Sequence, residues 1–272
     1  MKKGKAMRSM PPDVQHADNL SFSDRLLCCA LDIGEQMLIN GGEVHRVEDA
    51  IERICRSYGA VDTEVFCISS LMIATVRMED GSYSNQMRRI YNTGYNLTRL
   101  EKMNSISRKI CSEKMSFDKI DAMIKDAQRE KPYPVWLSFL GSILATGAFA
   151  VFFGGNIMDG IAAAIIGVIL TVIDTFHHSY INQMARTVIS SFVAGTLSYL
   201  MVYLGVGCNT DKIMIGTIML LVPGMAFGNA LRDLLVGDIL AGTLKIVQSL
   251  LIAVMIAFGY GIAIVIMGGI FK

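Results

Sequence analysis

Charged residues are distributed very unevenly along this chain of 272 residues. Twenty of the 25 Lys and Arg residues and 19 of the 24 Asp and Glu residues lie at or before Lys131, which leaves five basic and five acidic residues for the rest. A bilayer core disfavours charged side chains, whereas a soluble surface is rich in them. The distribution therefore predicts an α-helical polytopic membrane protein preceded by a cytoplasmic α+β domain, with the boundary near residue 131.

The second part, residues 132–272, contains apolar runs for five membrane spans. About 20 mostly apolar residues are needed to cross the hydrocarbon core of a bilayer. The spans are predicted at about 136–153, 157–175, 187–206, 213–231 and 239–267. Basic residues cluster before the first span, which predicts a plasma-membrane protein with its amino-terminal domain in the cytoplasm. Lys245 is expected to extend toward the interface.

The fourth apolar run is interrupted near its middle by Pro223-Gly224. Proline removes a backbone donor and clashes with the preceding turn, so a broken membrane helix is expected there. Polar and ionisable residues follow the break: Asn229, Arg232, Asp233 and Asp238. Because such groups at a broken span are typical of transporter sites, we interpret all six residues as a candidate substrate site. The alternative is that Arg232 and Asp233 anchor the helix at the interface and Asp238 caps the next helix.

A second group of titratable residues lies where the second span reaches the cytoplasm. It consists of Asp174, His177 and His178. The two histidines are expected to titrate near neutral pH, so we interpret the group as a candidate for proton coupling. An ordinary loop beside the membrane is the alternative.

The first part is expected to contain a disordered tail, residues 1–20, and an α+β domain, residues 21–131. Apolar spacing predicts a helix over 22–39, stopped by Asn40-Gly41-Gly42, and a second helix from about Glu43. β-Branched and aromatic residues and a turn at 79–82 predict strands, and capping residues begin two further helices. The strands are expected at 64–68, 71–78 and 86–91, and the helices at 96–111 and 116–129.

The start of the second helix holds the densest set of reactive side chains in this domain. The set is Gly42, His45, Arg46, Glu48 and Asp49. On a helix His45 and Asp49 would share a face, and Arg46 would pair with Asp49 or bind a carboxylate. One histidine with one carboxylate falls short of a metal site, so no metal is predicted. A solvated face with local ion pairs such as Glu52 with Arg56 is the alternative.

Several functional classes are not expected from this sequence. The net charge is +1 and the basic residues are interspersed with acids, which argues against a nucleic-acid partner. No glycine-rich phosphate loop is present, so neither ATP-driven transport nor another cofactor is expected. The six cysteines have no CxxC spacing, in keeping with a reducing cytosol.

A group of motifs together resembles the threonine/serine exporter family. The motifs are Gly42, Arg46-Val47-Glu48-Asp49, Tyr58-Gly59, Pro223-Gly224, Asn229, Arg232-Asp233, Gly237-Asp238 and Gly242. The resemblance covers the chain from about residue 21 and is to the half of the family that has a cytoplasmic domain plus five spans. Full-length members of the family carry a second, smaller membrane half on the same chain, whereas split members work with a separately encoded partner. The resemblance therefore implies an oligomer of this chain with such a smaller membrane half. Other split members are associated with succinate export.

Together these patterns predict a non-enzymatic subunit of a secondary exporter, driven by protons, for small carboxylate-bearing metabolites. The cargo would be threonine/serine or a dicarboxylate such as succinate. Arg232 would bind the carboxylate, and Asp233 or Asp238 would hold Arg232 or carry the proton. The alternative is a membrane-anchored sensor or scaffold whose cytoplasmic domain binds a ligand or partner. A hydrolase is least favoured, because no nucleophile, base and orienting group can be assigned together.

Overall fold

The structure is a computed structural model that describes residues 21–91, 93–129, 133–177 and 182–270. The chain divides into two compact units. The first is formed by Met1–Lys131 with Met225–Ile246, and the second by Pro132–Gly224 with Val247–Lys272. The predicted tail, residues 1–20, lies outside the described residues.

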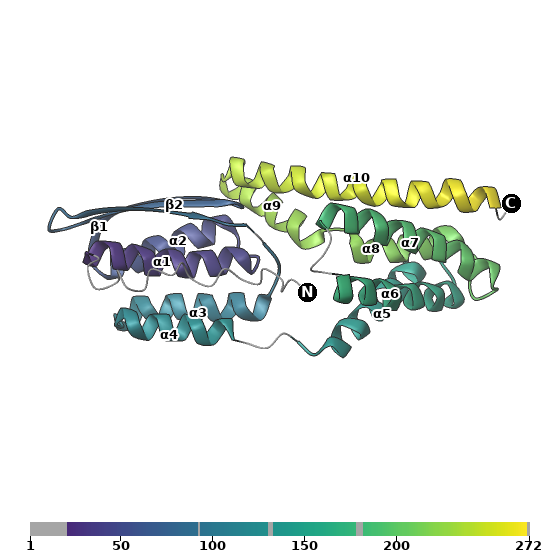
Figure 1. Ribbon diagram of the computed structural model, residues 1–272, viewed down its shortest axis with the longest axis horizontal. Coiled ribbons are helices and arrows are strands. Elements are labelled where there is room, and N and C mark those ends of the chain that lie inside the picture. Colours follow the sequence, from purple (N-terminus) through teal and green to yellow (C-terminus); the bar gives the residue numbers. More distant parts are fainter. Residues whose placement is uncertain (1–20, 92, 130–132, 178–181, 271–272) are drawn as a thin grey trace, which may run out of the picture. The chain divides into compact units, whose positions relative to one another are not determined.

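The first unit is built from one small sheet and two layers of helices (Figure 1). Strands β1 (Ala60–Ile68), β2 (Leu71–Met78) and β3 (Tyr83–Arg89) form an antiparallel sheet in the order β1-β2-β3. Helices α1 (Phe22–Ile39) and α2 (Val44–Ser57) pack on the sheet. Helices α3 (Leu97–Glu113) and α4 (Phe117–Gln128) pack together and against α1. This unit has the small sheet and the helices that the sequence predicts for the first part.

The core of this unit lies between the sheet and the helices. Met72, Ala74 and Val76 alternate along β2 and are fully buried, as expected for one face of a half-covered sheet. Apolar residues of α1 and α2 meet them, because both helices have an apolar stripe at helical spacing. The first strand starts earlier than predicted, at Ala60. The third strand covers Tyr83–Arg89 and not 86–91, because the pairing of Arg77 with Tyr83 extends the β2–β3 hairpin up to its turn.

The corner between α1 and α2 forms at the predicted stop signal Asn40-Gly41-Gly42. The N–H of Gly42 donates to the carbonyl of Met37 (2.8 Å) and that of Gly41 to Leu38 (3.2 Å). This pair of bonds is the Schellman motif, which needs a left-handed residue after the helix. Gly41 supplies it with φ +93°. The corner thereby turns the chain so that α2 begins at Val44, with Glu43 as its N-cap residue.

The second unit consists mainly of long apolar helices. Four helices are long and apolar enough to cross a membrane: α5 (Val135–Phe152), α6 (Ile157–His177), α7 (Gln183–Tyr203) and α10 (Ile239–Ile270). The break predicted at Pro223-Gly224 separates α8 (Thr210–Leu221) from α9 (Gly224–Val236) with a bend of 58°. The described helices therefore give four candidate spans, or five if α8 and α9 together form one.

Asp159 fixes the start of α6 to the turn that follows α7. Its carboxylate accepts hydrogen bonds from the backbone N–H groups of Cys208 (2.7 Å), Asn209 (2.8 Å) and Asn156 (3.0 Å) and from the Asn209 side chain (2.8 Å). The residue is fully buried. A carboxylate with this many donors acts both as a helix cap and as a cross-link between the two segments.

Residues of α9 and of the first turns of α10 fold with the first unit. Ala241 of α10 is buried in the same apolar cluster as α1, α2 and the sheet. The length of α10 accounts for this, because 32 residues extend about 48 Å, well beyond the roughly 30 Å of a bilayer core. Segment 225–246, which its apolar sequence predicts to be part of the membrane domain, therefore packs with the amino-terminal residues.

Replacing Gly41 with alanine should destabilise the protein more than the same change at Gly59. Both residues have nearly equal positive φ, +93° and +96°, which costs alanine roughly 1–2 kcal/mol. At Gly41 a Cβ would also lie 2.5 Å from the ring of Tyr95, whereas no described atom lies within 4 Å of one at Gly59. Overpacking adds about 1–3 kcal/mol. Unfolding of the full chain in detergent measures this difference; equal losses for the two variants would contradict the tight α1–α2 corner.

Candidate functional site

Helix α9 meets the α1–α2 corner through Asn229. Its side-chain amide donates to the carbonyl of Gly41 (3.1 Å), a group that the Schellman turn leaves without a helical partner. The two residues are 188 positions apart in sequence. One of the predicted substrate-site residues therefore contacts the corner next to Gly42, a residue of the predicted α2 motif.

Glu43 links the same two segments by charge. Its Oε1 lies 3.1 Å from a guanidinium nitrogen of Arg232, and its Oε2 lies 3.1 Å from Nε of Arg46. The Glu43 side chain is only 17% exposed, whereas both arginine side chains are more than half exposed. Two guanidiniums around one carboxylate leave a local charge of +1, with several N–H donors facing solvent. The three side chains form what we call the arginine pair site: Glu43, Arg46 and Arg232.

This arrangement corrects two predicted pairings. Arg46 pairs with Glu43 in the preceding turn, while Asp49 pairs with Arg53 (2.8 Å) in the following turn of α2. Glu52 pairs with Arg56, as the surface alternative proposed. Arg232 is held by Glu43 and not by Asp233 or Asp238, since consecutive residues on a helix point about 100° apart.

Asp233 instead forms a buried ion pair with Lys245 of α10. Its Oδ2 accepts from Nζ of Lys245 at 2.7 Å, and the two side chains are 1% and 14% exposed. Lys245 therefore does not extend to the interface as predicted. The pair closes the turn between α9 and α10, where the N–H of Asp238 also donates to the carbonyl of Asp233 (2.9 Å). We call residues 233–245 the α9–α10 corner.

The α9–α10 corner brings Asp238 to the first turns of α2. One ligand atom each of His45, Glu48 and Asp238 lies within 4.8 Å of the other two. Glu48 Oε1 accepts the backbone N–H of Cys67 in β1 (2.7 Å), which fixes this carboxylate. Burial raises the pKa of Glu48, and the nearby carboxylates of Asp238 and Asp233 raise it further, against the effects of the Cys67 hydrogen bond and His45. The carboxylates are therefore crowded.

Other predicted site residues lie apart from these contacts. Pro223 and Gly224 form the bend between α8 and α9. Asp174 lies near the end of α6 and pairs with Arg186 of α7 (3.0 Å). The side chain of His177 and all of His178 lie outside the described residues. The proton-coupling role of this group stays a prediction.

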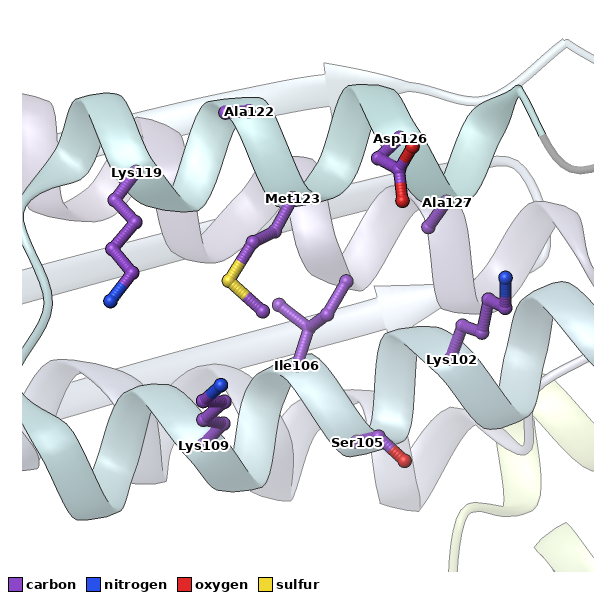
Figure 2. A pocket seen from close by; sticks show the side chains of 9 residues that line it. All are labelled: Lys102, Ser105, Ile106, Lys109, Lys119, Ala122, Met123, Asp126 and Ala127. Atoms are coloured by element: carbon purple, nitrogen blue, oxygen red, sulfur yellow. The ribbon is translucent and has the colours of Figure 1, made fainter.

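A groove between α3 and α4 contains none of the predicted site residues. Its volume is about 450 Å³, and Figure 2 shows Ile106 and Met123 in it, with Lys102, Lys109 and Lys119 around it. Asp126 and two alanines complete most of the lining. The groove is an apolar strip between two amphipathic helices with a basic margin.

Sequence reasoning missed Glu43, Lys245 and the carbonyl of Gly41. Glu43 follows the helix stop directly, which marks it as an N-cap position but does not reveal its partners. Lys245 is the only basic residue after Arg232 within the described part of the chain, so it was an available partner for Asp233. Its distance of 12 residues gave no helical spacing from which a contact could be predicted.

Removing Lys245 should cost far more stability than removing Arg232. Lys245→Met leaves the buried carboxylate of Asp233 unpaired, which typically costs about 3–5 kcal/mol. Arg232→Met breaks an exposed ion pair, typically about 0.2–1 kcal/mol. Unfolding of the full chain in detergent compares them, and Lys245→Met combined with Asp233→Asn should recover most of the loss. Similar losses for both single variants would contradict the buried pair.

Comparisons with known proteins place these contacts within a family. Residues 29–267 match the family model described as "Putative threonine/serine exporter". The chain is 28% identical over 218 residues to "Probable succinate transporter subunit YjjP" of Klebsiella aerogenes, which covers 79% of this chain and 81% of that protein. The Escherichia coli K12 protein of the same name is 24% identical over 248 residues, or 88% of this chain and 93% of its own.

A "Probable threonine/serine exporter" of Mycobacterium tuberculosis is 22% identical over 241 residues, which are 86% of this chain and 45% of that protein. No solved structure matches the chain. The family match includes the α1–α2 corner, the arginine pair site and the α9–α10 corner. Because it extends over most of the sequence, this chain belongs to the threonine/serine exporter family.

Proposed function

We propose that the protein is a subunit of a proton-coupled secondary exporter of small carboxylate-bearing metabolites, either threonine/serine or a dicarboxylate such as succinate. The family and the names of its relatives support a membrane exporter. The observation that supports a carboxylate-bearing cargo is the arginine pair site. Arg46 and Arg232 share one carboxylate, keep a net positive charge and are over half exposed. Guanidiniums recognise carboxylates through paired N–H donors, and every proposed cargo has a carboxylate.

A second membrane subunit is part of this proposal. Two relatives are named as transporter subunits. The chain also matches only 45% of the Mycobacterium tuberculosis relative, which leaves room in that protein for a second half. The resemblance noted from the motifs implies the same division. We infer a complex in which this chain supplies the amino-terminal unit and part of the membrane pathway.

We further propose that α8 and α9 together cross the membrane, giving five spans. Residues 132–224 belong to the second unit, and the α9–α10 corner, residues 233–245, belongs to the first. If residues 21–129 and this corner both lie in the cytoplasm, the chain between them crosses the plasma membrane an even number of times. Helices α5, α6 and α7 are three long spans, so the bent α8–α9 pair supplies the fourth. Helix α10 is then the fifth.

Proton coupling is a further part of this proposal. The Asp174 side chain is 66% exposed, so it can exchange protons with water. Its ion pair with Arg186 could break and re-form during transport. We assign the candidate proton group to Asp174, His177 and His178 because of their chemistry and their place near the end of α6. Pro223, Gly224 and Asp233 stay candidates for the substrate pathway from the sequence patterns alone.

Efflux of labelled succinate, threonine and serine tests the arginine pair site. The full chain with its partner subunit in proteoliposomes should lose efflux on Arg232→Ala or Arg46→Ala. One charged hydrogen bond contributes about 1.5–3 kcal/mol, so the apparent KM should rise by roughly tenfold or more. The control is Arg53→Ala on the same helix, an exposed arginine paired with Asp49. Unchanged efflux in both site variants would contradict the proposal, provided that the variants unfold like the parent.

Cysteine labelling tests the five-span topology. Cys208 is exposed in the turn after α7 and should react with a membrane-impermeant maleimide on intact cells. In a Cys208→Ser background, Leu235→Cys at an 88% exposed position of α9 should react only after permeabilisation. Labelling of Leu235→Cys on intact cells would contradict the passage of α8–α9 to the cytoplasmic side.

A further inference from the structure

The most unusual cluster that the proposed transport cycle does not use is formed by His45, Glu48 and Asp238. The first two lie on the first turns of α2, and the third lies in the α9–α10 corner. All three belong to the first unit. Together they offer one imidazole nitrogen and two carboxylates, the ligand types that bind Zn²⁺ and related divalent ions. The sequence had shown only two of them on one helix, which is too few for a site.

The geometry is close to what an ion needs. The three ligand atoms lie within 4.8 Å of one another. Zinc bonds to nitrogen and oxygen are about 2.0–2.2 Å, so ligands around one ion stand roughly 3.4 Å apart. A small rotamer change in each side chain covers this difference. His45 is exposed, which gives the ion an access route and leaves space for a water ligand.

A second, independent observation is that a carboxylate oxygen at the cluster is buried without a donor. Oδ2 of Asp238 is buried and has no hydrogen-bond donor among the described residues, and the same holds for Oδ1 of Asp233. Lys245 already pairs with the other oxygen of Asp233. Arg46 and Arg232 both bind Glu43. A buried carboxylate oxygen with no donor is costly, and a bound cation compensates that cost.

The supporting contacts also resemble those of metal ligands. Glu48 accepts the N–H of Cys67 with Oε1, which orients the carboxylate and leaves Oε2 for an ion. The N–H of Asp238 is bound by the carbonyl of Asp233, which fixes the backbone of this ligand. Hydrogen bonds that orient ligands in this way increase metal affinity.

We propose that His45, Glu48 and Asp238 bind a divalent transition-metal ion of the zinc type, which cross-links the start of α2 to the α9–α10 corner. The ion has three protein ligands and an open position for water. It joins segments that are 190 residues apart in sequence and lie beside the arginine pair site, so its binding stabilises the first unit. The proposal does not depend on the cargo or on transport.

Cobalt(II) absorption on the full chain in detergent, purified without a polyhistidine tag, tests the site. One equivalent of Co²⁺ should produce visible d–d bands without a thiolate charge-transfer band, and Zn²⁺ should displace it. His45→Ala and Asp238→Asn should each weaken Co²⁺ binding by about 100-fold or more, since even supporting residues contribute 10–100-fold. Glu48→Gln should do the same while keeping an acceptor for Cys67. Zn²⁺ should raise the unfolding temperature of the parent and not that of these three variants.

The matched control is Asp49→Asn, on the same helix turn but paired with Arg53. It should bind Co²⁺ like the parent, although the sequence alone would pair Asp49 with His45. The proposal is overturned if the parent binds neither ion, or if the three site variants bind as tightly as Asp49→Asn. A thiolate band would assign the binding to a cysteine and also overturn it. Binding of Mg²⁺ or Ca²⁺ in place of Zn²⁺ would overturn the zinc-type assignment.

Discussion

The buried ion pair between Asp233 and Lys245 is the interaction on which the functional region depends. It lies in a segment that is apolar enough to resemble a membrane span, and its two charges satisfy each other away from water. By closing the α9–α10 corner it fixes Asn229 and Arg232 on one side and Asp238 on the other. Those three residues make the contacts to the α1–α2 corner and α2.

The first turns of α2 present two different electrostatic environments to this segment. Glu43 and Arg46, three residues apart, face Arg232 and form an exposed cationic edge. His45 and Glu48, also three residues apart, lie close to Asp238 and form a crowded anionic cluster. Helical periodicity separates the two pairs, so one short stretch carries both a cationic surface and an anionic cluster. In a carboxylate exporter the first would receive the cargo, while the second would hold the corner in place.

Much of the fold was predictable because its signals are local. Spacing within a few residues predicts the helix stop at Gly41, the apolar stripe of α2, the break at Pro223 and the four long apolar helices. Arg46, Arg232 and Asp238 were also nominated individually, whereas Glu43 and Lys245 were not. Their partners were wrong where the sequence suggested near neighbours: Arg46 joins Glu43 and not Asp49, and Arg232 joins Glu43 and not Asp233.

The sequence by itself determined the division of the chain into a charged and an apolar part, the helix types, and the two groups of reactive residues. These features depend on hydropathy and periodicity, which can be read from a short window of the sequence. Only the tertiary structure decided that segment 225–246 folds with the amino-terminal residues and that His45 and Glu48 lie close to Asp238. Contacts across 190 residues depend on how whole elements pack, because the free energy of burying Ala241, Asp233 and Lys245 belongs to the assembled core and not to any local pattern.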